Sequence, residues 1–395
     1  MPYLSCVSCS KKIELGPQSR CECGEPLEVH YECLKPPARI AEEANFIIRN
    51  MNIFPLTKLK PELSLGEGST PLLSANYLKD EIGLKEFYLK NETVNPTWSF
   101  KDRGTSLGIQ AAIKFDFQCI GTVSSGNMAA SISAYASKAG LAAYVFVQDN
   151  IPEEKLRSIA IYGVSLYRGV GDYSELYNNA LTLGEEHNIF FVSSDNPFRV
   201  EGQKTIAYEI FDQLNYESLD FIIMPVSSGG NMAAVIKACE EMEAMCLIKR
   251  APIVIGVQAA GCSPIATAVA IGKNKIEHFG QPNTVAFAIS NPYPPSGNRV
   301  LNKVKEGRAS VVSISEKEIL TAQLELARKE GLFVQPAGAI SVAAARRLMS
   351  TGILKPEHKV AAILTGGGLK DTNILTTHSL EIGTVPVNKL ELVLR

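Results

Sequence analysis

Hydrophobic residues alternate along the chain between short continuous runs and longer amphipathic stretches, most regularly after residue 84. Short apolar runs bounded by turn residues are typical of buried strands, and apolar residues three and four positions apart are typical of helices. The pattern predicts strands over residues 85–90, 119–123, 142–147, 189–192, 221–226, 252–257 and 360–364. It predicts helices over residues 100–114, 126–139 and 201–214, the last with Ile206, Ile210 and Leu214 on one face. This alternation indicates an α/β fold in which parallel sheets are covered by helices.

Glycine-containing turns with polar side chains follow three of the predicted strands, at residues 124–127, 227–231 and 365–368. Ligands bind beyond the carboxyl ends of parallel strands, and a glycine turn before a helix leaves backbone N–H groups free to hold an anion. The middle turn, Ser-Ser-Gly-Gly-Asn, combines adjacent glycines with hydroxyl groups and predicts a phosphate site. Any one of these turns alone could be an ordinary loop of an α/β protein.

Lys101 lies at the start of a predicted helix, in the segment Asn95-Pro-Thr-Trp-Ser-Phe-Lys-Asp-Arg-Gly104. A lysine amine condenses with an aldehyde only when it is neutral. An apolar wall made by Trp98 and Phe100, together with the positive end of the helix dipole, would disfavour the charged form. Most lysines beside a turn are simply solvated. In combination with the three glycine turns, however, the segment predicts a Schiff-base lysine.

Length and charge limit the remaining classes of protein. The chain has 395 residues and a formal net charge of −2. Because domains commonly hold about 100–200 residues, we expect two of them. The charge gives no basic surface for nucleic acid, and no apolar stretch reaches the roughly 20 residues that cross a bilayer. The N-terminus lacks the basic and apolar segments of a signal peptide, so we expect a cytoplasmic protein with a small-molecule ligand and no nucleic-acid or membrane partner.

Five of the nine cysteines lie within the first 33 residues. Cys6 and Cys9 are separated by two residues and Cys21 and Cys23 by one, and together they could supply four thiolates to a tetrahedral zinc. Because the second pair is shorter than usual, Cys33 is an alternative ligand. A disulfide and free thiols are the other interpretations; a reducing cytoplasm opposes the first and the clustering opposes the second. The later cysteines are expected to fill the core, namely Cys119, Cys239, Cys246 and Cys262.

Five motifs occur in an order that resembles the threonine synthase family. They are Leu-Gly-Glu-Gly-Ser-Thr-Pro-Leu at 65–72, the lysine segment at 95–104, Ser-Ser-Gly-Asn at 124–127, Asn-Pro-Phe-Arg-Val-Glu-Gly-Gln-Lys-Thr at 196–205, and Leu-Thr-Gly-Gly-Gly-Leu-Lys-Asp at 364–371. The resemblance covers essentially the whole chain, including the cysteine-rich start. It implies a fold-type II pyridoxal-phosphate enzyme, similar to the tryptophan synthase β chain, which is commonly a homodimer.

The resemblance also implies a division into domains. A zinc-ribbon-like segment would cover residues 1–35, a large cofactor-binding α/β domain residues 36–114 and 206–395, and a smaller, mobile α/β domain residues 115–205. The irregular, proline-rich stretch at 280–299 is expected to be a surface loop or a lid.

Roles for single residues follow from the same resemblance. Lys101 would bond to pyridoxal 5′-phosphate and later carry protons to and from substrate carbons. Asn127 would contact the 3′-oxygen of the cofactor, and the Thr365 hydroxyl would contact its pyridine nitrogen. A hydroxyl partner leaves that nitrogen largely unprotonated, which suits elimination and replacement better than transamination. The cofactor phosphate would be held by Ser227, Ser228, Gly229, Gly230 and Asn231.

The expected substrate residues complete the site. Ser124 and Ser125 would receive the substrate carboxylate, and Ser194, Asn196 and Arg199 are candidates for a substrate phosphate. A guanidinium binds phosphate through paired donors, so Arg199 favours a phosphorylated substrate. The alternative for Arg199 is a surface salt bridge from a loop.

The implied reaction converts O-phospho-L-homoserine and water to L-threonine and phosphate by β,γ-elimination and replacement. Departures from the family pattern occur at Trp98, where glycine is usual, at Ser227 and Ser228, where Gly-Asn is common, and at Gly367, where histidine is common. They leave open a threonine or serine dehydratase, or another fold-type II β/γ-replacement enzyme acting on a related amino acid or phosphoamino acid. A non-enzymatic zinc-ribbon protein with a remnant cofactor domain is the competing class, and the intact Lys101 and Thr365 argue against it.

Overall fold

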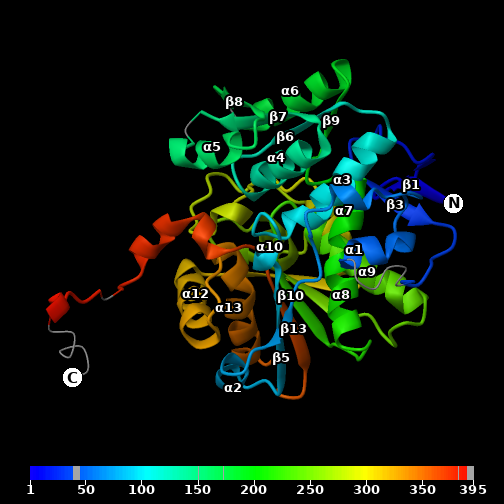
Figure 1. Ribbon diagram of the computed structural model, residues 1–395. Helices are drawn as coiled ribbons and strands as arrows, with labels where there is room; N and C mark the ends of the chain where they lie inside the picture. The colour runs from blue at the N-terminus through cyan, green and yellow to red at the C-terminus, as the bar shows by residue number, and fades with distance from the viewer. Residues whose placement is uncertain (39–44, 150, 172, 381, 389–395) are drawn as a thin grey trace.

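The computed structural model describes residues 1–38, 45–149, 151–171, 173–380 and 382–388 (Figure 1). The expected domains include some residues that lie outside the described part of the chain, namely 39–44, 150, 172, 381 and 389–395. The described part forms a small ribbon sheet at the N-terminus, a larger sheet and a smaller sheet. It contains no helix that is both long and apolar enough to cross a membrane.

The larger sheet has the strand order β12-β11-β10-β13-β5-β4. Its strands are β4 (Leu72–Ser74), β5 (Glu86–Asn91), β10 (Phe221–Pro225), β11 (Ile253–Ala259), β12 (Ala309–Ile314) and β13 (Lys359–Leu364). All neighbouring pairs are parallel except β4 and β5, which run antiparallel with Leu72 opposite Lys90. The parallel arrangement confirms the predicted α/β class. The edge strands β4 and β12 were not predicted from the sequence.

Helices cover both faces of the larger sheet. Ile222 packs with Ile236 on one face, whereas Ile223 packs with Ile340 on the other. This alternation is what a strand buried on both sides requires. The first face carries α8 (Thr205–Gln213), α9 (Gly230–Ala244), α10 (Pro264–Ala270) and α11 (Gly297–Lys305). The second carries α2 (Leu78–Ile82), α12 (Glu316–Glu330) and α13 (Pro336–Ser350).

The smaller sheet is parallel throughout, with the order β8-β7-β6-β9, and lies above the larger one in Figure 1. Its strands are β6 (Cys119–Val123), β7 (Ala142–Gln148), β8 (Ser165–Gly169) and β9 (Ile189–Phe191). The helices around it are α4 (Asn127–Ala139), α5 (Glu153–Ala160) and α6 (Tyr173–Glu186). The edge strand β8 was not predicted, because it is mostly exposed and lacks an apolar run. The boundaries of the expected domains stay predictions.

The predicted helix over residues 201–214 is two helices. The first, α7 (Pro197–Gln203), starts earlier than expected. Lys204 lies between the two helices, where it caps the end of α7 and the start of α8. The Thr205 hydroxyl donates to the carbonyl of Gly202 at 2.7 Å, so a side-chain hydroxyl is bonded to a backbone carbonyl at the break. A Cβ on Gly202 would lie 2.2 Å from the carbonyl oxygen of Arg103 in α3 (Lys101–Lys114). The break therefore occurs where α7 crosses α3 too closely for any side chain.

The N-terminal ribbon sheet is antiparallel, with the order β2-β1-β3, and holds its own small core around Leu4, Leu27 and Val29. Its strands are β1 (Pro2–Cys6), β2 (Lys12–Ile13) and β3 (Leu27–Tyr31). The remaining elements are α1 (Phe46–Arg49) and short 3-10 helices, namely η1 (Met51–Ile53), η2 (Pro61–Leu63), η3 (Glu92–Val94), η4 (Phe287–Ile289), η5 (Gly368–Lys370) and η6 (Thr372–Thr377).

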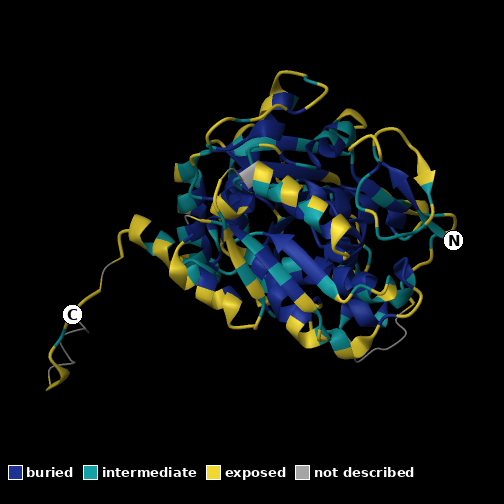
Figure 2. Cartoon of the chain, turned by 90° about the horizontal axis from the view of Figure 1, so that it is seen from above, coloured by how far each residue is buried: buried dark blue, intermediate teal, exposed yellow. Residues whose placement is uncertain are grey.

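Burial follows the layers, with dark strands at the centre and exposed residues along the outer sides of the helices (Figure 2). Cys239 and Cys262 are buried, as expected of core residues, and Cys119 is half-buried. Cys246 is exposed, so its assignment to the core was wrong. It follows the end of α9 in a left-handed backbone conformation with φ of 58°, outside the packed layers.

Candidate active site

Lys101 is the first residue of α3, and the loop before it is hydrogen-bonded to the glycine turn that follows β13. The Phe100 N–H donates to the Thr365 carbonyl at 3.1 Å, and the Gly367 N–H donates to the Trp98 carbonyl at 2.9 Å. Ser99 and Gly366 form an antiparallel bridge between these two bonds. The lysine and the predicted ring-binding turn are thus held side by side, although they are far apart in sequence.

The surroundings of Lys101 favour its neutral form. Burial, and then the positive charges of Arg199 and Lys370, lower the pKa of Lys101 from 10.5 to about 7. The ammonium nitrogen lies 4.3 Å from the ring centroid of Phe100, whose side chain is buried. A large share of the amine is therefore unprotonated at neutral pH, which a Schiff-base nucleophile requires.

Trp98 does not close the lysine pocket as the sequence suggested. Trp98 is 53% exposed as a residue, so the apolar wall is supplied by Phe100. The backbone of Trp98 has φ of 61°, in the left-handed region that favours glycine. This geometry gives a physical reason why glycine is usual at this position in the family, and it identifies Trp98 as a strained residue at the rim of the site.

The turn between β10 and α9 has the geometry of an anion site. Gly229 has φ of 92°, and a Cβ there would lie 2.8 Å from the Ser296 carbonyl oxygen. A Cβ on Gly230 would lie 2.3 Å from the carbonyl oxygen of Ser194. Both glycines are therefore required by close backbone contacts. Gly230 opens α9, so the N–H groups of its first turn and the helix dipole both favour a bound phosphate.

Asn231 carries the clearest sign of a ligand-binding site. Its side-chain oxygen and nitrogen are both buried, and neither has a hydrogen-bond partner among the described residues. Unpartnered buried amides are rare because each costs desolvation free energy. Ser228, by contrast, already accepts a hydrogen bond of 3.1 Å from the side chain of Asn291. The proline-rich stretch at 280–299 thus packs directly against this turn, where the Ser296 N–H also donates to the Ser228 carbonyl at 2.9 Å.

Asn127, at the start of α4, meets a residue that the sequence interpretation missed. Its side-chain nitrogen donates to Oε1 of Gln335, the residue before α13, at 2.7 Å. Thr365 is also buried nearby, and Gly366 lies against both amides. The sequence signal was a polar residue followed by proline at a helix start, which indicates a cap but not this contact.

The candidate substrate residues differ in how deeply they are buried and in whether their side chains are already hydrogen-bonded within the protein. Ser124 and Ser125 are half-buried in the turn after β6, and the Ser124 hydroxyl accepts from the Gly126 N–H at 3.3 Å. The side chain of Asn196 is fully buried and caps α7, where its oxygen accepts from the N–H groups of Phe198 at 3.0 Å and Arg199 at 3.2 Å. Asn196 therefore holds the helix rather than facing an open site.

Arg199 is only 2% exposed, which excludes the alternative of a surface salt bridge. Its Nη1 donates to the Ser193 carbonyl at 3.0 Å, and its Nε has no partner among the described residues. Burial lowers the pKa of Arg199 to about 10, against the opposing charge of Asp195. The result is a buried cation with spare donors close enough to influence Lys101.

A buried ionic network anchors α3, the helix that begins with Lys101, and was not expected from the sequence. Arg103 bonds to both oxygens of Glu92 and of Glu209 at 2.6–2.7 Å, and all three side chains are essentially inaccessible. Lys90 reaches Glu209 at 2.8 Å. Removing one partner of such a network leaves an uncompensated buried charge, so the network fixes α3 against β5 and α8.

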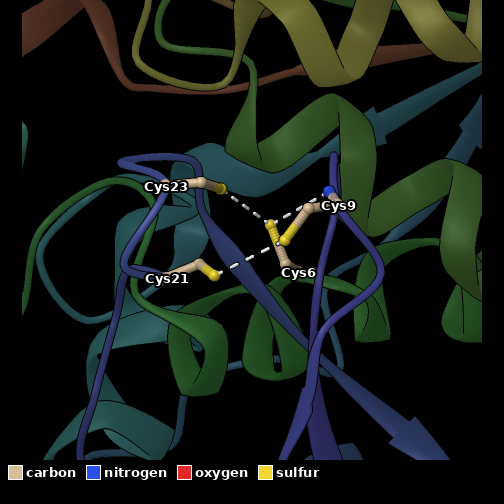
Figure 3. Close-up of side chains that lie close together, drawn as sticks. All are labelled: Cys6, Cys9, Cys21 and Cys23. Carbon is tan, nitrogen blue, oxygen red and sulfur yellow. Dashed lines mark hydrogen bonds between the residues drawn. The ribbon is translucent and has the colours of Figure 1, made fainter.

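The four predicted cysteine ligands come together beside the ribbon sheet (Figure 3). The sulfur atoms of Cys6, Cys9, Cys21 and Cys23 all lie within 4.8 Å of one another. The N–H groups of Ser8 and Cys9 donate to the Cys6 sulfur at 3.4 Å, as in a metal knuckle. Cys33 lies outside this cluster and is exposed, so the alternative of Cys33 as a ligand is not favoured.

Comparison with known proteins agrees with this geometry. A family profile described as "Pyridoxal-phosphate dependent enzyme" matches residues 63–366. A threonine synthase of Methanocaldococcus jannaschii is 35% identical over 93% of this chain and 92% of its own length. A threonine synthase of Methanosarcina acetivorans is 32% identical over 94% of this chain and 93% of its own. Among solved structures, maize serine racemase superposes with a TM-score of 0.66 at 23% identity, covering 78% of this chain and 91% of that one.

The parallel sheets, the lysine at the start of α3 and the glycine turn at the start of α9 define a fold-type II enzyme that uses pyridoxal phosphate. Within that class, the chain belongs to the threonine synthase family.

Proposed function

We propose that this chain converts O-phospho-L-homoserine and water to L-threonine and phosphate. The observation that carries the proposal is the combination of Lys101, whose pKa is lowered, and Arg199, a buried cation whose Nε bonds to no described residue. The first can handle protons at neutral pH and the second can receive a phosphate group. The threonine synthase relatives, similar over almost the full chain, support the same activity.

The residues of the site fit pyridoxal phosphate, which when bound supplies an electron sink for negative charge that develops at substrate carbons. We infer that Asn231 and the N–H groups of the turn hold the cofactor phosphate, since the Asn231 amide is buried and no described residue bonds to it. Thr365 is proposed to contact the ring nitrogen and Asn127 the ring oxygen. The other residues proposed around the phosphate are Ser227, Ser228, Gly229 and Gly230.

At the substrate end of the site, different residues have different proposed roles. Lys101, as a neutral amine, takes the α-proton of the substrate, passes it on so that the amine is neutral again, and then takes a β-proton, which it gives to the γ-carbon after the phosphate has left. Arg199 and Ser194 are proposed to bind the phosphate as it leaves, and Asn196 supports them by capping the helix that carries Arg199. Ser124 and Ser125 are proposed to orient the substrate carboxylate. The hydroxyl of water then adds at the β-carbon, and the Lys101 ammonium returns a proton to the α-carbon, while the proton from water leaves to solvent or with the phosphate.

Zinc is proposed to occupy the cluster of Cys6, Cys9, Cys21 and Cys23. Sulfur ligands at about 2.3 Å around a tetrahedral zinc lie roughly 3.8 Å from one another. The separations of 3.4 Å between Cys6 and Cys23 and of 3.7 Å between Cys9 and Cys21 are close to that value. Four thiolates leave no open position on the metal, so its role would be structural.

We further propose that residues 115–205 form a smaller mobile unit, and that the chain is a cytoplasmic homodimer. An ion pair of 3.2 Å between Lys155 of α5 and Asp371 spans the smaller unit and the segment after β13, and it is a contact that such motion would make and break. The nine cysteines, all of them among the described residues, form no disulfide with one another, which is compatible with a reducing compartment. Dimerisation rests on the resemblance to fold-type II enzymes.

The test is to add O-phospho-L-homoserine to the purified holoenzyme and to assay threonine and phosphate together. Equal amounts of both, abolished by Lys101→Ala, are expected. If the protein instead released ammonia and a 2-oxo acid from threonine or serine without any need for phosphate, the dehydratase alternative would replace the proposal. Unchanged function in Lys101→Ala would contradict an enzymatic role.

A further inference from the structure

The cysteine-rich ribbon touches the loop that leads into the Arg199 helix. Arg20, the residue before Cys21, donates from Nη2 to Oδ2 of Asp195. The side-chain nitrogen of Asn196 donates to the Ser19 hydroxyl at 3.3 Å. The same Arg20 also bonds to the Gly24 carbonyl within the ribbon. The ribbon and the loop before α7 are therefore joined through two neighbouring residues on each side.

Asp195 lies between two arginines. Its side chain is 1% exposed, and its charge acts on Arg199 as well as binding Arg20. The other carboxylate oxygen, Oδ1, accepts from the Ser193 hydroxyl at 2.7 Å and from the Tyr177 hydroxyl at 3.5 Å. Both oxygens are thus occupied by groups other than Arg199.

Because both oxygens of Asp195 bond to other groups, Asp195 does not pair with Arg199. Its Nη1 bonds to the neutral Ser193 carbonyl, and no carboxylate forms an ion pair with Arg199 within the ranges that the structure describes. A buried carboxylate near a buried guanidinium would normally pair with it. The guanidinium can receive a phosphate only if that carboxylate is held elsewhere.

We propose that Arg20 is a positioning residue for substrate binding: by holding Asp195, it keeps Arg199 available to the substrate phosphate, and so makes the cysteine-rich ribbon part of the construction of the active site. This inference rests on the proposed function for the identity of the phosphorylated substrate. The described bonds of Arg20 go to Asp195 and to the Gly24 carbonyl, and not to Arg199 itself. The effect of Arg20 passes through one carboxylate.

A loss of Arg20 has a specific consequence. Asp195 would lose its ionic partner in the ribbon, and Arg199 is the cation whose pKa it already influences. Pairing of the two would withdraw Arg199 from phosphate. We expect Arg20→Gln to raise the KM for O-phospho-L-homoserine about 10-fold, equivalent to roughly 1.4 kcal/mol, with a change in kcat of less than about 3-fold.

The experiment compares holoenzyme variants in two assays. One assay measures KM and kcat, and the other measures the dissociation constant of inorganic phosphate from the change it causes in the visible absorbance of the bound cofactor. Arg20→Lys should retain most of the affinity because it keeps the charge. Lys11→Gln is the matched control, since Lys11 pairs with Glu22 inside the ribbon and its bonds do not reach the 193–199 loop.

The decisive variant is the double mutant Arg20→Gln, Asp195→Asn. Removing the carboxylate should release Arg199 and restore phosphate affinity to within about 2-fold of the wild type, with zinc content and melting temperature recorded for each protein. Because Asp195→Asn also removes an uncompensated buried charge, the melting temperature is expected to recover even if the role of Arg20 is purely structural, so the recovery of phosphate affinity is the result that supports the proposal. Equal phosphate affinity in Arg20→Gln and Lys11→Gln, or no recovery in the double mutant, would overturn the inference.

Failure of the proposed function would be seen separately. A wild-type holoenzyme that makes no threonine would contradict the substrate assignment. The phosphate titration does not depend on turnover, so it would still show whether Arg20 controls anion binding at Arg199.

Discussion

The side-chain nitrogen of Asn127 donates a hydrogen bond of 2.7 Å to Oε1 of Gln335. Asn127 begins α4 beside the smaller sheet, and Gln335 precedes α13 on the larger sheet. A Cβ on Gly366 would lie 2.6 Å from Oε1 of Gln335, so the glycine of the turn makes room for the contact. Gln335 therefore sets the orientation of an amide that is proposed to face the cofactor ring.

Substitution of Gln335 should alter the cofactor rather than the fold. In Gln335→Ala, Asn127 loses its acceptor and is free to rotate, so we expect cofactor affinity to fall about 5-fold to 10-fold and the visible absorbance band to shift. Titration of the apoprotein with pyridoxal phosphate measures both effects. Gln281→Ala, at an exposed position, is the control, and identical spectra in the two variants would contradict the role of Gln335.

The pKa of Lys101 predicts the pH dependence of cofactor attachment. Since burial, Arg199 and Lys370 lower this pKa to about 7, the rate of attachment to apoprotein should rise with pH and level off above about pH 8. Arg199→Gln removes a neighbouring positive charge and should move the midpoint to higher pH. Stopped-flow absorbance at a series of pH values gives both midpoints. A midpoint near 10 in the wild type would show that the amine is not perturbed.

The same shift has a consequence for stability. The unfolded chain keeps the Lys101 proton up to about pH 10.5, whereas the folded apoprotein releases it near pH 7, so the unfolded state binds more protons between these values. Unfolding free energy of the apoprotein should therefore rise with pH across this window, relative to Lys101→Met. Denaturant titrations at pH 6 and pH 9 measure the difference. No divergence between the two proteins would contradict the lowered pKa.

Asn231 should contribute to cofactor affinity because its buried amide has no hydrogen-bond partner in the part of the chain that the structure describes. Hydrogen bonds to a charged group contribute about 1.5–3 kcal/mol, so Asn231→Ala should weaken pyridoxal phosphate binding by roughly 10-fold or more. Fluorescence titration of the apoprotein is the measurement. Asn178→Ala, on the exposed side of α6, should bind the cofactor like the wild type. Equal affinity in both variants would remove Asn231 from the phosphate site.

One zinc ion per chain is expected at the cysteine cluster, and it should be lost in Cys6→Ser and Cys21→Ser. Cys33→Ser is the matched control because the Cys33 sulfur donates to the Leu34 carbonyl at 3.6 Å, outside the cluster. Metal analysis of the purified variants, with X-ray absorption to identify sulfur ligands, gives the result. Full zinc content in Cys21→Ser would contradict the proposed ligand set.

Trp98 offers a test of backbone strain. A β-branched residue at φ of 61° is strongly disfavoured, so Trp98→Val should lower the unfolding free energy by about 1–2 kcal/mol, whereas Trp98→Gly should not lower it. Trp98 is the chain's only tryptophan, so unfolding is best followed by circular dichroism. Tyr77→Val is the control, at an exposed aromatic with φ of −95°. Equal stability of the Val and Gly variants at residue 98 would contradict the strain.

Local pattern was enough to find the strands that carry the site. The predicted strand over residues 119–123 coincides with β6, and the polar turn follows it directly. The period of the hydrophobic residues and the positions of the glycines depend only on residues close together in the sequence, so both can be recognised without knowing the fold. The helix break at Lys204 could not be predicted, because it results from the close crossing of Gly202 with Arg103.

By itself, the sequence determined the α/β class, the position of Lys101 at a helix start, the glycine turns at strand ends and the four clustered cysteines. The tertiary structure decided which groups meet. Asn127 and Gln335 are 208 residues apart, and Arg20 and Asp195 are 175 apart. The burial that lowers the pKa of Lys101 and keeps Arg199 from solvent likewise exists only after α3 and α7 have packed together. Desolvation and long-range contact depend on packing, and no local pattern in the chain encodes them.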